Sequence, residues 1–170
     1  LFYTFDQMQI GATGSFVGDE SPIPFMATFQ EIEIDLETGQ ITPIEIVSVV
    51  DCGTAINPAL AKGQVEGATL QALGPSLYEE LTFSSKGTPT NASLFMYKIP
   101  DRSSYGKVTV ELVDSYEPTG PFGAKSVSEI GIDSPTVTLL NAIYNATGIR
   151  FNKVPVSPEK MLKAIKKILE

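Results

Sequence analysis

Glu129 is the residue whose surroundings in the sequence most directly suggest chemistry. It lies within segment 120–131 (GPFGAKSVSEIG), where a glycine-rich stretch is followed by Lys125. Free backbone N–H groups of such a loop, together with a lysine, can hold an anion. The apolar neighbours Val127 and Ile130 could exclude water from the Glu129 carboxylate, which would then accept a proton near neutral pH. The pattern alone also allows an ordinary loop with a solvent-facing glutamate, which is the more frequent case.

A second candidate is Gln64, within segment 61–74 (AKGQVEGATLQALG). Small residues around it would let its side-chain amide reach a ligand across a close backbone contact. The alternative is tight packing of a helix on a sheet, with Gln64 exposed to solvent. Segment 11–18 (GATGSFVG) does not fit GxGxxG, and the chain contains no GxxxxGK[ST], so neither nucleotide-binding loop is predicted.

The composition excludes several other classes of site. The chain has no histidine, which removes the Ser-His-Asp triad and almost every zinc site, so a carboxylate, a lysine or a borrowed cofactor must carry any catalysis. Cys52 is the only cysteine; no intrachain disulfide can form, and a reducing compartment such as the cytoplasm is expected. The net charge of -8 argues against nucleic acid. No apolar run approaches the roughly 18–20 residues that cross a bilayer, so no membrane association is expected.

Two β-branched runs around a turn predict an antiparallel hairpin. Residues 30–35 alternate polar and apolar side chains, a period of two that marks a strand with one solvent-facing side. Residues 37–39 (ETG) have turn chemistry, because the glycine can take a positive φ. The run 41–51 is again strand-like, with Pro43 at an edge or just inside the start of the strand.

The first helix is predicted to begin at Asn57-Pro58 and to run to Glu80, because a capping side chain precedes a proline at the first helical position. Pro75 should bend or interrupt it. A stripe of leucines would face the core: Leu60, Leu70, Leu73 and Leu77.

The remaining elements predict an α+β fold. A turn at 84–87 and a strand over 107–114 precede a helix over 134–148, and a last helix begins at Ser157-Pro158. An apolar stripe marks this last helix: Met161, Leu162, Ile165, Ile168 and Leu169. The predicted order, β-β-α-β-α-β-α, suggests one domain over 1–170 in which helices pack on one face of a mixed or antiparallel sheet.

Taken together, the motifs resemble the molybdenum hydroxylase family of xanthine dehydrogenase and aldehyde oxidase. The resemblance extends from about Gly14 to Leu162, and two segments carry it: DCGTAINPALAKGQVEGATLQALG at 51–74 and EPTGPFGAKSVSEIG at 117–131. It implies that the chain is the C-terminal part of a molybdenum-cofactor-binding subunit, within a larger molybdopterin-binding domain. The first residue, Leu1 rather than Met, likewise suggests a piece of a longer or processed chain.

The resemblance assigns roles to individual residues. Glu129 matches the active-site glutamate, which takes a proton from the metal-bound hydroxyl as that group attacks an electron-poor carbon; hydride passes to the Mo=S sulfur, and the product oxygen comes from water. Gln64 matches the glutamine that contacts the pterin. Four residues match the loop that lines the cofactor: Gly123, Ala124, Lys125 and Ser126. The pterin dithiolene holds the metal, so no protein metal ligand is expected, and Cys52 is interpreted as a buried structural thiol.

The resemblance also implies cofactors and partners. The cofactor would be molybdenum-molybdopterin, with or without an appended cytidine nucleotide, while iron–sulfur clusters and FAD would lie on other domains or subunits. The upstream half of the molybdenum subunit would complete the pocket for a small-molecule substrate. We therefore expect the isolated chain to fold, to hold no cofactor and to be inactive, because half the contacts do not offset the ordering cost. An exposed apolar face could also drive homo-oligomerisation.

The substrate is predicted from the residues around Glu129. Many family members have GxGEPP there, whereas this chain has SVSEIG at 126–131, a form that favours hydroxylation of xanthine or another purine. Other branches remain alternatives: aldehyde oxidoreductase, carbon monoxide dehydrogenase or an aromatic acyl-CoA reductase. Two readings from other classes are a non-catalytic structural or assembly remnant and an unrelated α+β binding module.

Overall fold

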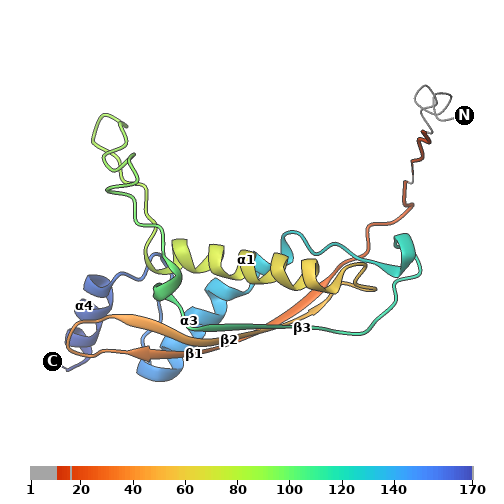
Figure 1. The fold of residues 1–170 in the computed structure, drawn as a ribbon. Helices are drawn as coiled ribbons and strands as arrows, with labels where there is room; N and C mark the ends of the chain where they lie inside the picture. Colours follow the sequence, from red (N-terminus) through yellow and green to blue (C-terminus); the bar gives the residue numbers. More distant parts are fainter. Residues whose placement is uncertain (1–10, 16, 170) are drawn as a thin grey trace, which may run out of the picture.

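A computed structural model describes residues 11–15 and 17–169 (Figure 1). Strands β1 (Phe25–Ile34) and β2 (Ile41–Asp51) form the predicted antiparallel hairpin. The turn between them closes as expected, since Gly39 has a φ of 76° and its N–H donates to the Asp35 carbonyl at 2.7 Å. Strand β3 (Lys107–Leu112) pairs with β2 in parallel, which gives a mixed sheet in the order β1-β2-β3.

Helix α1 (Pro58–Leu77) begins as predicted, with the Asn57 side chain accepting a hydrogen bond from the Leu60 N–H at 3.1 Å. The helix continues through Pro75 but ends two residues later, at Leu77, three residues before the predicted end at Glu80. A proline at this position interrupts little, because only Ser76 and Leu77 follow it in the helix. Leu73 and Leu77 are buried as expected. Leu60 is 72% exposed, so its place in the apolar stripe was predicted wrongly.

The C-terminal part contains α2 (Ile130–Asp133), α3 (Pro135–Thr147) and α4 (Pro158–Leu169). Gly148 ends α3 in the left-handed region, as predicted. The fourth strand that the predicted order requires is not found among the described residues. In its place, residues 149–156 run irregularly between α3 and α4, and the Val156 N–H donates to the Ser76 carbonyl at 2.8 Å near the end of α1. Of the predicted α4 stripe, Met161 and Ile165 are buried and Ile168 is exposed.

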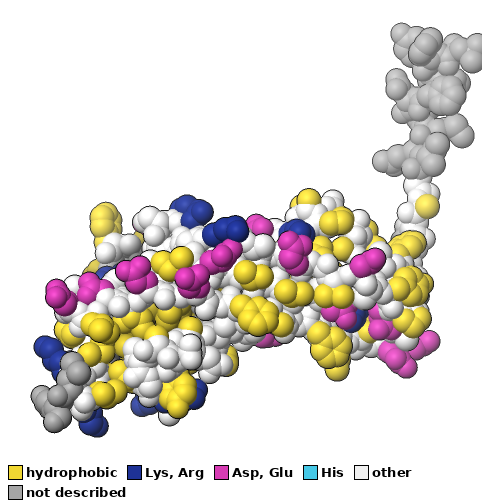
Figure 2. Space-filling view, turned by 90° about the horizontal axis from the view of Figure 1, so that it is seen from below, with side chains coloured by type: hydrophobic (Ala, Val, Ile, Leu, Met, Phe, Trp, Pro, Cys, Tyr) yellow, Lys and Arg dark blue, Asp and Glu magenta, His cyan; other side chains and the backbone are white. Residues whose placement is uncertain are grey.

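The helices pack on one face of the sheet. Ile46 of β2 belongs to a buried cluster that also contains Leu73 and Leu77 of α1, Leu139 and Ile143 of α3, and Met161 of α4. The predicted α+β architecture is therefore confirmed. The alternate side chains of β1 face away from the core, and Phe25 and Phe29 remain largely exposed. Seen from below the strands, the surface carries hydrophobic patches interspersed with acidic side chains (Figure 2).

An excursion between α1 and β3 extends away from the helices and strands (Figure 1). It contains the predicted turn at 84–87, which an isolated bridge between Phe83 and Pro89 flanks. A second turn lies at 94–96, and the 3-10 helix η1 (Arg102–Ser104) precedes β3. Leu94 and Phe95, within this excursion, are exposed. Within the described residues, no helix has the length and apolar character needed to span a membrane.

Candidate functional site

The glycine-rich loop at 120–126 lies against the end of β2. The Thr54 N–H donates to the Gly123 carbonyl at 2.7 Å, and the Lys125 N–H donates to the Cys52 carbonyl at 2.7 Å. Gly53 and Ala124 form an isolated antiparallel bridge between these two bonds. The two sequence motifs, separated by about 70 residues in the chain, are thus joined by backbone hydrogen bonds at one end of the sheet.

Glycine is required at both sides of this junction. Gly53 has a φ of 65°, and a Cβ there would lie 2.3 Å from the Gly123 carbonyl oxygen. Gly123 has a φ of 82°, and a Cβ there would lie 2.3 Å from the Tyr116 ring. Both positions combine a left-handed backbone with a close approach, which only glycine tolerates without strain. Phe122, within the 3-10 helix η2 (Pro121–Gly123), also has a positive φ of 54°, and its side chain is 84% exposed.

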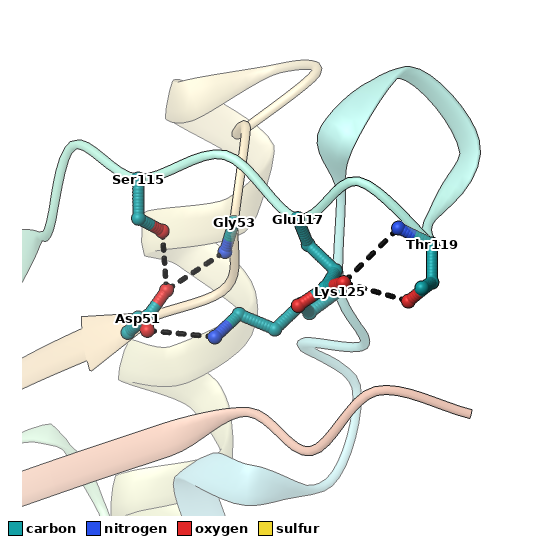
Figure 3. A network of polar contacts seen from close by, with 6 residues as sticks. All are labelled: Asp51, Gly53, Ser115, Glu117, Thr119 and Lys125. Atoms are coloured by element: carbon teal, nitrogen blue, oxygen red, sulfur yellow. Dashed lines mark hydrogen bonds and ion pairs between the residues drawn. The ribbon is translucent and has the colours of Figure 1, made fainter. Parts of the chain in front are cut away.

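An ion pair between Asp51 and Lys125 reinforces the junction (Figure 3). Lys125 Nζ lies 2.6 Å from Asp51 Oδ2, with the two side chains 7% and 23% exposed respectively. Asp51 Oδ1 accepts hydrogen bonds from the Gly53 N–H at 3.0 Å and from the Ser115 hydroxyl. The hydrogen bond from Lys125, followed by those from Ser115 and Gly53, lowers the pKa of Asp51 to about 2. The carboxylate is therefore charged throughout the physiological range.

The Lys125 ammonium also lies 5.1 Å from the centre of the Phe25 ring, within cation–π range. Sequence reasoning assigned this lysine to an anion but missed its partner Asp51. The signal was weak, because Asp51 and Lys125 are 74 positions apart. The only feature of the sequence that pointed to Asp51 was its position directly before Cys52-Gly53, in the same motif as Gln64.

Gln64 reaches the segment that carries Glu129. Its Nε2 donates to the Ser128 carbonyl at 2.6 Å, which links α1 to the backbone just before the glutamate. Gln64 and Ser128 line two neighbouring cavities. The first, of about 340 Å³, is also lined by Ala124 and Lys125, and the second, of about 440 Å³, by Glu129.

The structure thus brings four of the predicted site residues to one surface: Gln64, Ala124, Lys125 and Glu129. Gly123 is buried beneath it at the junction. Ser126 is exposed and lines a different hollow, on the side of the loop that faces residues 18–22.

Glu129 itself is exposed, at the residue that precedes α2. The expectation that apolar neighbours would enclose its carboxylate is not met. Val127 and Ile130 instead turn away and pack against the buried cluster that contains Val50 and Val65. Glu129 is therefore free to contact a group placed in the cavity.

The floor of the second cavity is formed by helix α1. A Cβ added at Gly63 or at Gly67 would meet nothing within 4 Å, so these glycines leave the helix surface open rather than admitting another segment of the described chain. Gln64 and Gln71, whose side chains carry amides, line the cavity beside these two glycines. The second cavity thus combines small residues, which leave space for a bound group, with amide side chains that can form hydrogen bonds to it.

No cluster of three or more acidic, cysteine or histidine side chains that could hold a metal ion occurs within 11–15 and 17–169. Cys52 is buried, as predicted for a structural thiol, and burial is the main cause that raises its pKa.

The chain is similar to known proteins over most of its length. The family model described as a molybdopterin cofactor-binding domain matches residues 2–105. A probable hypoxanthine oxidase of Escherichia coli is 38% identical over 157 residues, which cover 92% of this chain and 16% of that protein. An aldehyde oxidoreductase of Megalodesulfovibrio gigas is 36% identical over 144 residues, which cover 84% of this chain and 15% of that protein.

The fold is similar to solved structures as well. A reconstituted CO dehydrogenase from Oligotropha carboxidovorans matches with a TM-score of 0.78 at 26% identity, over 85% of this chain and 18% of that one. The chain spans 16% of the length of the hypoxanthine oxidase and a similar share of the others. The match of the family model over more than half of the chain, together with these relatives, shows that the chain belongs to the molybdenum-cofactor-binding subunits of the molybdenum hydroxylase family.

Proposed function

We propose that this chain forms the glutamate-bearing wall of a molybdenum hydroxylase pocket, with Glu129 as the proton acceptor. The observation that carries the proposal is the convergence of Gln64, Ser128 and Glu129 on one cavity. When bound, molybdenum-molybdopterin would supply the redox chemistry and the water-derived oxygen. The Glu129 carboxylate oxygen would take up the proton released as that oxygen bonds to the substrate carbon.

Gln64 and the loop 123–126 would hold the pterin. Gly63 and Gly67 leave room for a flat ring against α1, and the amide of Gln64, already oriented by Ser128, retains an oxygen that can accept a hydrogen bond. Burial of Gly123 and the backbone bonds of Ala124 and Lys125 keep the loop in place. Preformed contacts of this kind reduce the ordering cost of binding.

Oxidation of xanthine or another purine is the substrate class we propose. It is supported by the SVSEIG sequence around Glu129 and by the likeness to a probable hypoxanthine oxidase. The likeness to an aldehyde oxidoreductase, at a similar identity, favours an aldehyde as the second candidate. The exposed position of Glu129 is compatible with either, because the residues that would contact the far side of the substrate are not among those described.

Membership of this family also supports a proposal for the larger assembly to which the chain would belong. We propose that residues 1–170 act as one domain at the C-terminal end of a longer cytoplasmic subunit, and that the upstream part of that subunit completes the pocket. Electrons would leave through iron–sulfur clusters and FAD on other domains or subunits. The small share of each relative that the chain covers supports such an arrangement. An appended cytidine nucleotide on the pterin belongs to this proposal too.

The test uses the full-length subunit, assembled with its partners, and compares Glu129→Gln with Glu33→Gln, an exposed glutamate on β1. Turnover of hypoxanthine, xanthine and benzaldehyde is measured per bound molybdenum. We expect Glu129→Gln to lower kcat by about 100-fold or more, the usual contribution of a general base, while molybdenum content stays unchanged. Glu33→Gln should match the parent protein.

Two outcomes would contradict the proposal. If Glu129→Gln retains kcat within about threefold at full molybdenum content, Glu129 is not the proton acceptor. If the assembled parent protein never contains molybdenum, the chain is a structural or assembly remnant of the family.

A further inference from the structure

We propose that Asp51 and Lys125 act as positioning residues, and that Lys125 serves the site through Asp51 rather than as a ligand for an anionic group of the cofactor. The pair would clamp loop 120–126 to the end of β2 and so fix the wall that carries Ser128 and Glu129. This inference rests on the proposed function, since it concerns the geometry of the same pocket.

The Lys125 ammonium is already paired with Asp51. It is 2.6 Å from Asp51 Oδ2, its side chain is 7% exposed, and one side of it faces the Phe25 ring at 5.1 Å. A short ion pair with so little exposure is stronger than a surface pair, since the surrounding dielectric is lower. To bind a second anion, the ammonium would have to leave a carboxylate that has no other cation within ion-pair distance in the described structure.

Asp51 joins three separate segments of the chain. Through Oδ1 it accepts hydrogen bonds from Gly53 in the 51–54 turn and from Ser115 after β3, and through Oδ2 it contacts Lys125 in the glycine-rich loop (Figure 3). One carboxylate with both oxygens used in this way determines the relative position of all three segments. The Ser115 bond would contribute nothing to anion binding, which favours positioning of the loop as the role of the whole network.

Only a few residues separate the ion pair from the pocket. Ser128, three residues after Lys125, accepts the hydrogen bond from Gln64, and Glu129 follows it directly. The loop is also held by backbone bonds, because the Gly123 carbonyl accepts from both the Thr54 N–H at 2.7 Å and the Glu117 N–H at 3.0 Å. Loss of the ion pair should therefore shift the loop rather than unfold it, and displacements of about 1 Å can cost up to about 100-fold in rate.

The two possible roles of Lys125 predict opposite effects of Asp51→Asn. If Lys125 binds an anion of the cofactor, removing Asp51 frees the ammonium, and cofactor retention is unchanged or improved. If the pair is a clamp, Asp51→Asn and Lys125→Met disturb the same contact. Each should then lower kcat per bound molybdenum, and the double variant should be no worse than either single one.

The experiment uses the cofactor-loaded full-length subunit with its partners, and the variants Asp51→Asn, Lys125→Met, their combination and Lys125→Arg. The exposed pair Glu45–Lys107, at 2.9 Å, provides the matched controls Glu45→Gln and Lys107→Met. For each variant, kcat and KM per bound molybdenum, the molybdenum content and the visible circular dichroism of the cofactor are measured. A purely structural role would reduce yield and molybdenum content but leave kcat per molybdenum unchanged.

We expect both single variants to lower kcat per molybdenum by about tenfold and to change the circular dichroism, with non-additivity in the double variant. Lys125→Arg should recover most of the rate, because a guanidinium can also pair with the carboxylate. The control variants should match the parent protein. If Lys125→Met does not accumulate, Asp51→Asn and Lys125→Arg still carry the test, since each retains a hydrogen-bonding side chain.

Three outcomes would overturn the inference: loss of molybdenum in Lys125→Met but not in Asp51→Asn, additive effects in the double variant, or unchanged kcat in both single variants. Failure of the proposed function is recognised separately. In that case Glu129→Gln would retain full activity, whereas the coupling between Asp51 and Lys125 would still be measurable in the circular dichroism.

Discussion

The two ends of the sheet are held together by different kinds of contact. At the end near α4, Ile46, Leu139, Ile143 and Met161 form a fully buried apolar cluster, and the β1–β2 turn packs against α4 through Gly39 (Figure 1). At the opposite end, where β2 reaches Asp51, a smaller apolar cluster around Val50 and Val65 is joined by backbone hydrogen bonds and the Asp51–Lys125 ion pair. We call these two regions the apolar end and the polar end. Apolar packing provides most of the folding free energy but little directional constraint, whereas the polar contacts determine where the loop lies.

This difference suggests that the two ends of the sheet have different tasks. The apolar end should tolerate surface changes but not cavities, because the side chains there are close-packed. The polar end should tolerate modest losses of stability but not changes of geometry, since the proposed site residues follow directly from its loop. We therefore expect substitutions at the apolar end to lower stability, and substitutions at the polar end to displace the loop.

The largest effect on stability should come from Leu139→Ala at the apolar end. Leu139 is fully buried in α3, and the substitution should lower the free energy of unfolding by about 3 kcal/mol through lost burial and the cavity that remains. Val137→Ala, on the same helix but exposed, is the control and should cost less than about 1 kcal/mol. Urea denaturation of the two variants measures the difference. Equal losses would show that the apolar cluster is not the main source of stability.

Elements specified by local signals were the ones that the sequence predicted best, at both ends of the sheet. Alternation in β1, the turn at Gly39, the cap at Asn57 and the stop at Gly148 are all local signals, and all are present in the structure. Errors arose where a tertiary contact decided the local structure. Val156, for example, donates its N–H to α1 instead of extending a fourth strand.

The polar end was only partly predictable, for a physical reason. Lys125 and Glu129 were identified by the motif, but the partner of Lys125 depends on how β2 and the glycine-rich loop are brought together in space. The orientation of Val127 and Ile130 toward the core, which leaves Glu129 exposed, likewise depends on α1 packing beneath them. A single sequence contains residue types and spacing, and neither specifies such long-range pairings.

The next largest effect should be a pH-dependent loss of stability at the polar end. The folded-state pKa of Asp51, about 2, lies below its ordinary value of 3.8, so the stabilising contribution is present above about pH 4 and is lost as the pH falls toward 2. At pH 7, Asp51→Asn should lower the free energy of unfolding by about 2 kcal/mol. Urea denaturation of both proteins from pH 7 to pH 2 measures this difference, which should shrink as the pH falls.

The exposed glutamate Glu45 provides the comparison for this titration. Glu45→Gln breaks a solvent-exposed pair and should cost less than about 1 kcal/mol at pH 7. A pH-independent difference between the parent protein and Asp51→Asn would contradict the assignment of this stability to the charged carboxylate. It would also remove the electrostatic part of the contrast between the two ends.

The smallest effect concerns Cys52, which lies where the two kinds of contact meet. Its backbone carbonyl accepts the Lys125 N–H of the polar junction, while its side chain, 2% exposed, packs with Val50, Val65 and Val110. Burial raises the pKa of the thiol, so the reactive thiolate is disfavoured on two grounds, access and ionisation. At pH 8 we expect iodoacetamide to modify Cys52 only after urea unfolds the chain, and Cys52→Ala to cost about 1 kcal/mol. Mass spectrometry monitors the alkylation, and rapid modification of the folded protein would mean that the junction opens readily. The loop would then be positioned by the cofactor or by the rest of the subunit, and not by its own contacts.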